Sequence, residues 1–316
     1  MNEKNLKFNK KNILELRKES VDEINKYYRE LRKYEFDNDV ELKNFELRKK
    51  IHPLMMMVLK IDRIIDKEKV IIIGDKRKPH HYPVIFAATH IGGNDIMRVF
   101  EAIKEHAYIM LGDPGIVYVN EIGLFLRLNG FIPVDTRDKE DRKIAYARSV
   151  EVINNNVNML IFPEGAYNVF EHLPIMKIFP GAVRMAKETN SEIIPIAIEQ
   201  YGKDFLVNIG ENIKIDNNMS NEEANVILTE ILSTLKWEIW ETQEIAQRES
   251  YTDEYINNFR QSVVDRDDYG DYVYTLQDIY ETMYHDSSII SLEEVFEPIN
   301  NLITNKNKTR VLRKTR

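Results

Sequence analysis

Short runs of β-branched and aliphatic residues alternate with amphipathic segments between residues 70 and 210, and this alternation limits the possible folds most strongly. The runs are 70–75 (VIIIGD), 83–90 (PVIFAATH), 107–113 (AYIMLGD), 130–136 (GFIPVDT), 158–165 (NMLIFPEG), 192–202 (EIIPIAIEQYG) and 204–210 (DFLVNIG). Helical patterns near 94–106, 115–128, 138–153 and 180–189 separate several of them. Strands that alternate with helices are typical of a helix-covered, largely parallel sheet. We predict an α/β fold with a mixed, largely parallel central sheet covered by helices.

Two local patterns refine this expectation. The connection between 70–75 and 83–90 is short and contains Lys76, Arg77, Lys78 and Pro79, so these two runs are expected to pair as antiparallel neighbours. The run 192–202 contains Pro195, which has no backbone N–H to donate to a neighbouring strand. Proline in a strand indicates an edge position or a distorted ladder.

The segments on either side of the sheet are expected to be helical. Residues 1–67 have apolar residues at helical spacing, with Pro53 either starting a new helix or kinking one, and 219–316 continue the chain after the last strand. We therefore divide the chain into an N-terminal helical segment (1–67), an α/β core (68–218) and a helical C-terminal extension (219–316) with a basic tail from residue 306. The run Met55–Met57 either packs on the core or touches a lipid chain, because methionine adapts to irregular apolar partners.

Composition excludes several classes of function. The 316 residues include no cysteine, which rules out disulfides, thiolate metal sites and a thiol nucleophile. The 44 basic and 52 acidic side chains give a net charge of −8, which disfavours nucleic-acid partners. No apolar run approaches the roughly 18 residues of a spanning helix, and no apolar stretch follows the basic N-terminus as in a secretory signal. We expect a cytoplasmic protein, with peripheral contact at the inner face of the membrane left open.

The segment from Ala87 to Asp95 (AATHIGGND) holds the first candidate catalytic pair. A buried strand delivers His90 to its end, where ligand and catalytic groups gather in open α/β sheets. Asp95, in the first turn of the following helix, is placed to hydrogen-bond one nitrogen of the His90 ring and leave the other to accept a proton. The alternative is that Asp95 only caps the helix and His90 is a turn residue.

Three further blocks end or form strands in a similar way. The segment 162–165 (FPEG) places a carboxylate, Glu164, and a glycine, Gly165, at a strand end. The segment 130–135 (GFIPVD) ends in Asp135, and 193–198 (IIPIAI) is a buried strand with a proline. The seven histidines show no metal-ligand spacing, so we infer no metal.

In order and spacing, these four blocks resemble the motifs of the glycerol-phosphate and lysophosphatidate acyltransferase family. His90 and Asp95 match its HxxxxD motif, 130–135 its second motif, 162–165 its FPEG motif and 194–197 its apolar fourth motif. The resemblance covers about residues 70–215. It implies an O-acyltransferase of phospholipid biosynthesis that moves a fatty acyl group from acyl-CoA or acyl carrier protein to a hydroxyl, with these thioesters as co-substrates and no other cofactor.

The resemblance also assigns roles to residues. It implies that His90 is the general base on the acceptor hydroxyl, that Asp95 orients it, and that Glu164 and Gly165 position the acceptor. A thioester is already activated, so proximity, a base and oxyanion stabilisation suffice, and no Ser or Cys nucleophile is needed.

Two departures from the family pattern concern the acceptor. Thr136 stands where the second motif has an arginine, with Arg137 one place later, and Ala166, Tyr167 and Asn168 follow FPEG in place of Thr-Arg-Ser. The acceptor is therefore either lysophosphatidate or glycerol phosphate, held by a shifted cation such as Arg137, or a non-phosphorylated hydroxyl that Tyr167 and Asn168 contact. A catalytically silent acyl-binding protein and a thioester hydrolase are further alternatives. The basic residues 76–78, with His80 and His81, either meet donor phosphates or form a solvated turn.

Overall fold

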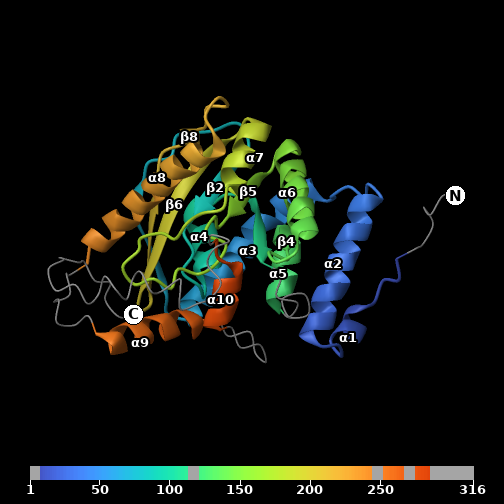
Figure 1. The fold of residues 1–316 in the computed structure, drawn as a ribbon, viewed down its shortest axis with the longest axis horizontal. Helices are drawn as coiled ribbons and strands as arrows, with labels where there is room; N and C mark the ends of the chain where they lie inside the picture. Colours follow the sequence, from blue (N-terminus) through green and yellow to red (C-terminus); the bar gives the residue numbers. More distant parts are fainter. Residues whose placement is uncertain (1–7, 113–120, 244–251, 267–274, 285–316) are drawn as a thin grey trace.

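The computed structural model describes residues 8–112, 121–243, 252–266 and 275–284 (Figure 1). Its helices are α1 (Ile13–Leu16), α2 (Val21–Asp37), α3 (Phe45–Ile65), α4 (Asp95–Ile103), α5 (Glu121–Asn129), α6 (Lys139–Asn154), α7 (Gly181–Thr189), α8 (Asn221–Glu241), α9 (Asp253–Val264) and α10 (Leu276–Thr282). Its strands are β1 (Lys69–Asp75), β2 (Val84–Ala88), β3 (Ala107–Gly112), β4 (Phe131–Val134), β5 (Asn158–Ile161), β6 (Glu192–Tyr201), β7 (Asp204–Ile209) and β8 (Ile213–Lys214). The basic tail from residue 306 lies outside the described residues.

The strands form one mixed sheet in the order β1-β7-β6-β2-β5-β3-β4, with β8 paired to the start of β6. Neighbours from β6 through β2, β5 and β3 to β4 are parallel, and β7 and β8 are antiparallel to β6. The predicted fold class is therefore confirmed. The predicted β1–β2 pairing is wrong: β1 pairs in parallel with β7, so two strands separate it from β2. The hairpin of β6 and β7 fills that space, and a connection of eight residues spans it.

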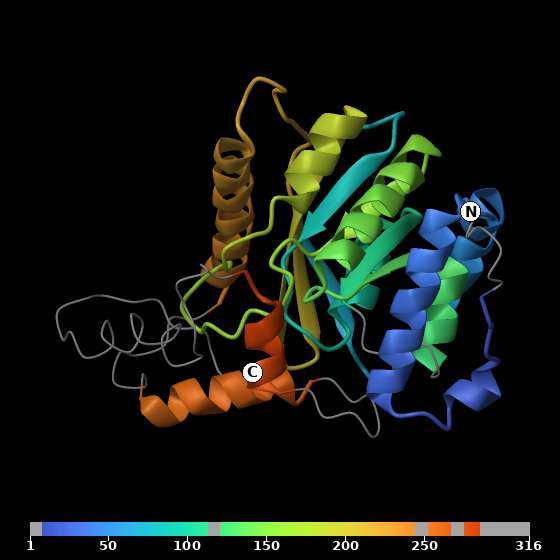
Figure 2. The ribbon, with the colours of Figure 1, turned by 45° about the vertical axis from the view of Figure 1, so that its right-hand side comes forward.

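Helices cover both faces of the sheet (Figures 1 and 2). Successive residues of β2 point to opposite faces, so Ile85 and Ala87 join the core under α6, α7 and α8, whereas Phe86 joins the core under α3, α4 and α5. All five β2 side chains are buried, as expected for a central strand covered on both faces. The site-bearing strand is thus buried on both faces.

Pro195 lies in the interior strand β6, not at an edge. On one side of β6 it is paired in register with Ala87 of β2. On the other side it falls between the residues that pair with β8 and those that pair with β7, and its carbonyl accepts from the Gly210 N–H at 2.9 Å. The missing proline N–H therefore faces the break between two partner strands, where no ladder bond is lost. Of the two expectations, the distorted ladder is the one observed.

The N-terminal helices are attached by charge and by apolar packing. Arg32 of α2 forms a bidentate pair with Asp141 of α6 at 2.9 and 2.7 Å. Helix α3 continues through Pro53 without a break and packs on α4 and α5. In its methionine run, Met55 is buried and Met57 is 52% exposed. Packing on the core is thus confirmed for Met55, whereas contact with a lipid chain stays a prediction, because the structure shows only that Met57 faces solvent.

Among the described residues, no helix is both long enough and apolar enough to span a bilayer. Among the described residues after α8, the helices α9 and α10 lie at one end of the sheet (Figure 1). The three-part division of the chain at residues 67 and 218 stays a prediction.

Candidate active site

The two main motif segments lie at the same edge of the sheet because their strands are parallel neighbours. Ala87 of β2 is in register with Ile161 of β5. His90 and Glu164 each follow the end of one of these strands within three residues. The carboxyl ends of adjacent parallel strands meet at one edge, which is where open α/β sheets bind ligands.

His90 and Asp95 form a buried hydrogen-bonded pair. The distance from His90 Nδ1 to Asp95 Oδ2 is 2.8 Å, and the same carboxylate oxygen accepts the backbone N–H groups of Ile91 at 2.7 Å and Gly92 at 3.0 Å. Asp95 is fully buried in the first turn of α4, where the helix dipole favours a negative charge. Because this carboxylate accepts at Nδ1, the imidazole carries its proton there and keeps a lone pair on Nε2.

Glu164 supports the backbone around the pair. Its Oε1 accepts the His90 backbone N–H at 2.9 Å and its Oε2 accepts the Met176 N–H at 2.8 Å, and the side chain is fully buried. Burial raises the pKa of the Glu164 carboxyl to about 7, opposed by these two donors and by the charge of Lys236. The carboxylate therefore links the loop after β2 to the loop after β5.

Aromatic rings hold the His90 imidazole on two sides. The ring stacks on Phe162 with centroids 4.1 Å apart, and Tyr167 contacts it edge-on at 4.4 Å. The Asn168 N–H donates to the His90 carbonyl at 3.0 Å. Gly92 has φ +83° and lies against the Tyr167 ring, so a larger residue there would press on the wall of the site. His90 retains 10% side-chain exposure through the remaining opening.

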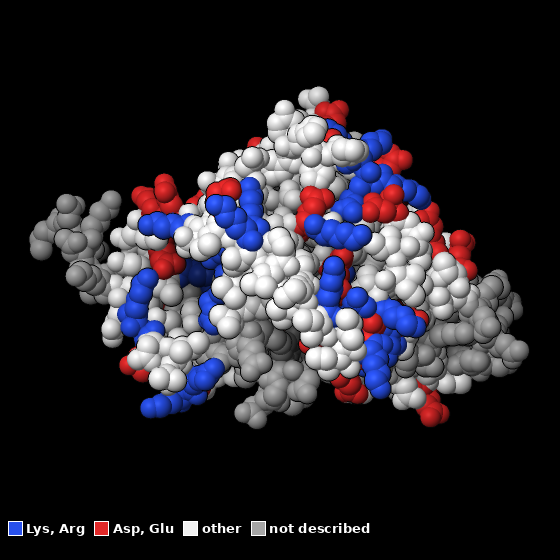
Figure 3. All heavy atoms as spheres, turned by 180° about the vertical axis from the view of Figure 1, so that it is seen from behind, with Lys and Arg blue, Asp and Glu red and all other residues white. Residues whose placement is uncertain are grey.

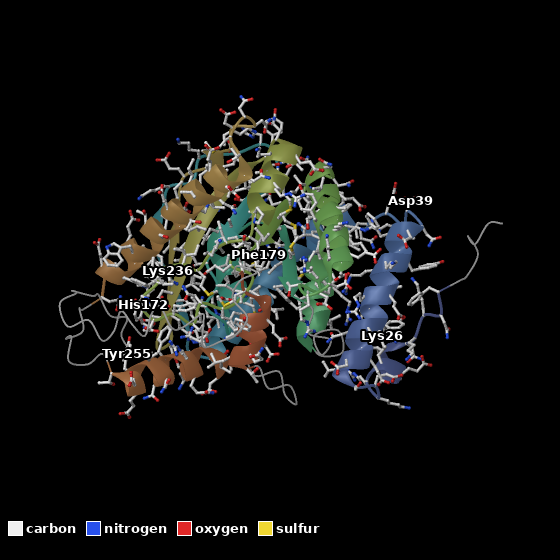
Figure 4. All side chains as sticks on the ribbon, in the orientation of Figure 1. Lys26, Asp39, His172, Phe179, Lys236 and Tyr255 are labelled. Carbon is white, nitrogen blue, oxygen red and sulfur yellow. The ribbon has the colours of Figure 1, made fainter. Side chains whose placement is uncertain are left out.

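Gly165 is the contact point with the C-terminal extension. It has φ +73°, and a Cβ there would lie 2.5 Å from the Phe179 ring and 3.1 Å from the Thr282 carbonyl at the end of α10. Figure 4 labels Phe179 at this central position. Only glycine combines this backbone conformation with so close an approach.

Three other predicted site residues make polar contacts within the protein. The Asn168 side chain donates to the Leu173 carbonyl and accepts the Phe170 N–H, which folds the loop after β5. The Thr136 carbonyl accepts a hydrogen bond from Arg142. Arg137 is 60% exposed and pairs with Asp135 at 3.6 Å and with Glu281 of α10 at 3.4 Å.

The basic stretch 76–78 lies at the opposite end of β2 from His90. It precedes the strand and His90 follows it, and a strand of five residues spans about 17 Å. Its basic groups are also paired: Arg77 contacts Asp75 and Glu105, and Lys78 contacts Glu211. We therefore assign no donor phosphate to this stretch.

The structure shows two contacts near this edge of the sheet that the sequence did not predict. Lys236 of α8, which is labelled in Figure 4, is fully buried. It pairs with Glu199 at 3.1 Å and donates to the Ile198 carbonyl. Arg266, just after α9, donates to the Ile91 carbonyl next to His90 at 2.7 Å. Both come from the C-terminal extension, and neither belongs to a local pattern that marks a site.

Comparison with known proteins agrees with this geometry. The family model described as Acyltransferase matches residues 69–199, which include His90, Asp95 and Glu164. Residues 69–199 are therefore similar to the domain that this family model describes. A 1-acyl-sn-glycerol-3-phosphate acyltransferase of Borreliella burgdorferi is 24% identical over 156 residues of this chain. The match covers 49% of this chain and 61% of that relative.

The fold also has a solved structural counterpart. The crystal structure of the 1-acyl-sn-glycerophosphate (LPA) acyltransferase PlsC from Thermotoga maritima matches with a TM-score of 0.51 and 15% identity, over 67% of this chain and 88% of that one. At this identity the match concerns the fold. The family resemblance inferred from the motifs is confirmed, and the family model ends well before α8, α9 and α10.

Proposed function

We propose that this protein is an O-acyltransferase that transfers a fatty acyl group from a thioester, acyl-CoA or acyl carrier protein, to the hydroxyl of a glycerophosphate-type acceptor. The observation that carries the proposal is the His90–Asp95 pair at 2.8 Å, placed at the carboxyl edge of a sheet with the acyltransferase fold. The name of the Borreliella relative supports the acceptor class.

The proposed reaction needs one base and no covalent intermediate. Nε2 of His90 takes the proton of the acceptor hydroxyl as its oxygen attacks the thioester carbonyl carbon. The C–S bond then breaks, an ester forms, and the thiolate leaves with the proton from His90. Asp95 holds the ring in the required tautomer and stabilises the imidazolium that forms in between. Glu164 is a positioning residue, because its carboxylate contacts the backbone of His90 and not the open side of the ring.

We also propose that α3 touches the membrane from which a lipid acceptor is drawn. Its outer side has exposed apolar side chains at helical spacing: Leu47, Leu54, Met57, Val58, Ile61, Ile64 and Ile65. An amphipathic surface of this kind inserts into the headgroup region when it meets a bilayer. In Figure 3, which views the molecule from behind, basic and acidic side chains are interspersed with uncharged surface.

A vesicle assay tests the membrane contact. An Ile61→Ser, Ile64→Ser double variant should lose sedimentation with phosphatidylcholine vesicles, because two apolar anchors are removed from the exposed side. The control is Val226→Ser, which removes a comparably exposed apolar side chain from α8. Equal sedimentation of the double variant and the control would refute the contact.

The chemistry is tested with His90→Ala. We expect transfer from acyl-CoA or acyl carrier protein to lysophosphatidate or glycerol phosphate to fall by about 10²–10⁴-fold, the usual contribution of a general base. His81→Ala, an exposed histidine in the link before β2, is the matched control and should keep wild-type activity. Unchanged transfer in His90→Ala would refute the mechanism. Donor binding without transfer by the wild type would instead identify an acyl-binding protein, and fatty acid release without acceptor would identify a hydrolase.

A further inference from the structure

The C-terminal helices α9 and α10 form part of the wall of the candidate active site. Phe259 and Val263 of α9 and Ile279 of α10 are buried in one cluster with Val169 and Phe170, which belong to the loop after β5. Figures 1 and 2 show both helices at the end of the sheet. This packing lies outside the part of the chain that the family model matches, so it is a feature of this chain rather than of the matched motifs.

Arg266 reaches from the end of α9 to the loop that follows His90. Its Nη1 donates to the Ile91 carbonyl at 2.7 Å, and its Cβ would lie 3.2 Å from a Cβ placed on Gly93. The N–H groups of this loop point the other way and bind Asp95. One side of the loop therefore holds the carboxylate and the other holds a guanidinium.

This guanidinium lacks the partner that comparable arginines have. Arg32, Arg63 and Arg98 each pair with a carboxylate within 3 Å. Among the residues that the structure describes, Arg266 pairs with no carboxylate, and its Nη2 is buried without a hydrogen-bond partner. A covered cation with unused donors is costly, and an anionic ligand would satisfy it.

The acceptor requires such a cation. A phosphate monoester is bound best by the two-pronged donors of an arginine. Arg137, the shifted candidate from the second motif, already pairs with two carboxylates and is mostly exposed. Thr136 and Asn168 carry no charge. Within the described residues, Arg266 is the cation that directly contacts the loop after His90.

We propose that Arg266 binds the phosphate group of the acceptor beside His90 and so determines the preference for phosphorylated acceptors. This inference rests on the proposed acyltransferase function. Because Nη2 is covered in the structure, binding requires the guanidinium to turn or its cover to shift when the acceptor enters. The bond from Nη1 to Ile91 would keep the arginine attached to the loop during that change.

The test compares two acceptors that differ only in the phosphate, lysophosphatidate and the corresponding monoacylglycerol, with one acyl donor. Arg266→Gln should lower kcat/KM for lysophosphatidate by about 10- to 100-fold, mainly through KM, because hydrogen bonds to a charged group are lost. Transfer to monoacylglycerol should change by less than about threefold. Arg266→Lys, which keeps the charge and one donor nitrogen, should lose less than Arg266→Gln.

A matched control and a binding measurement separate this inference from the proposed function. The control is Arg48→Gln. The Arg48 guanidinium also donates to backbone carbonyls, but it is far from His90 in the chain, so its loss should not change the acceptor preference. Equal losses on both acceptors, or no loss, would overturn the role of Arg266. Calorimetric binding of lysophosphatidate requires no turnover. If the wild type transfers no acyl group but binds lysophosphatidate more tightly than Arg266→Gln, the proposed function is refuted and the phosphate site is kept. If the wild type does not bind lysophosphatidate, the phosphate site is refuted.

Discussion

Replacing Asp95 with asparagine separates two effects of its carboxylate, orientation of His90 and stabilisation of positive charge. All three N–H donors around Asp95 point at one oxygen, Oδ2, at 2.7, 2.8 and 3.0 Å. An amide oxygen in the same position can accept all three. The amide nitrogen would then take the place of Oδ1, which is buried without a partner in the described structure. Asp95→Asn should therefore keep the tautomer of His90 and lose only the negative charge.

The expected magnitude follows from the difference between charged and neutral hydrogen bonds. A hydrogen bond to a charged group is worth about 1.5–3 kcal/mol and a neutral one about 1 kcal/mol, so the imidazolium loses about 0.5–2 kcal/mol of stabilisation. That difference corresponds to a rate about 2- to 30-fold lower. Asp95→Ala removes the acceptor of all three donors, so it should cost about 10²–10⁴-fold.

Release of free thiol from acyl-CoA in the presence of acceptor measures this rate directly. The protein contributes no thiol signal because it contains no cysteine. Asp37→Asn, the same change at an exposed position at the end of α2, is the control and should leave the rate unchanged. A loss as large as that of His90→Ala in a folded Asp95→Asn protein would refute retained orientation. A loss of less than about twofold would refute charge stabilisation.

Three further predictions concern stability. Gly165→Ala should lower the free energy of unfolding by about 1–3 kcal/mol more than Gly202→Ala, because both glycines have positive φ but only Gly165 lies against Phe179; equal losses in chemical denaturation would contradict the contact. Burial lowers the pKa of His106 from 6.5 to about 4, so the unfolded chain binds a proton that the folded chain does not. Stability should therefore fall between pH 6.5 and 4 by up to about 1.4 kcal/mol per pH unit, and His106→Phe should lack this part of the slope. Glu164→Gln should lower the free energy of unfolding by about 1–3 kcal/mol, because one of the two backbone N–H groups that the carboxylate accepts would then face an amide N–H. A thermal midpoint equal to that of the wild type would contradict this prediction.

The sequence predicted the fold class because its information is local and repeated. Each strand of the core has its own apolar run, and the alternation with amphipathic helices recurs several times between residues 70 and 202. The candidate pair His90 and Asp95 could also be predicted from the sequence, since the two residues are five apart and the turn between them has two glycines. The contact at 2.8 Å is the one that this spacing favours.

The errors occurred where pairing depends on residues far apart in the chain. The short link after β1 suggested that β1 pairs with β2, but β1 pairs with β7, more than 130 residues later. Pro195 could not be placed, because whether its missing N–H is tolerated depends on where β7 and β8 leave β6. Strand order is a competition between distant partners, and a single local run does not contain that information.

The candidate pair and the α/β architecture follow from neighbouring residues, since hydrophobic periodicity and close spacing act over a few positions. The surroundings of the pair depend on packing between segments that the chain brings together from far apart. Glu164 supports His90 from 74 residues away, and Arg266 reaches the same loop from 175 residues beyond Ile91. Burial and the dielectric environment arise only once those segments have packed, and they determine which cations are paired with carboxylates.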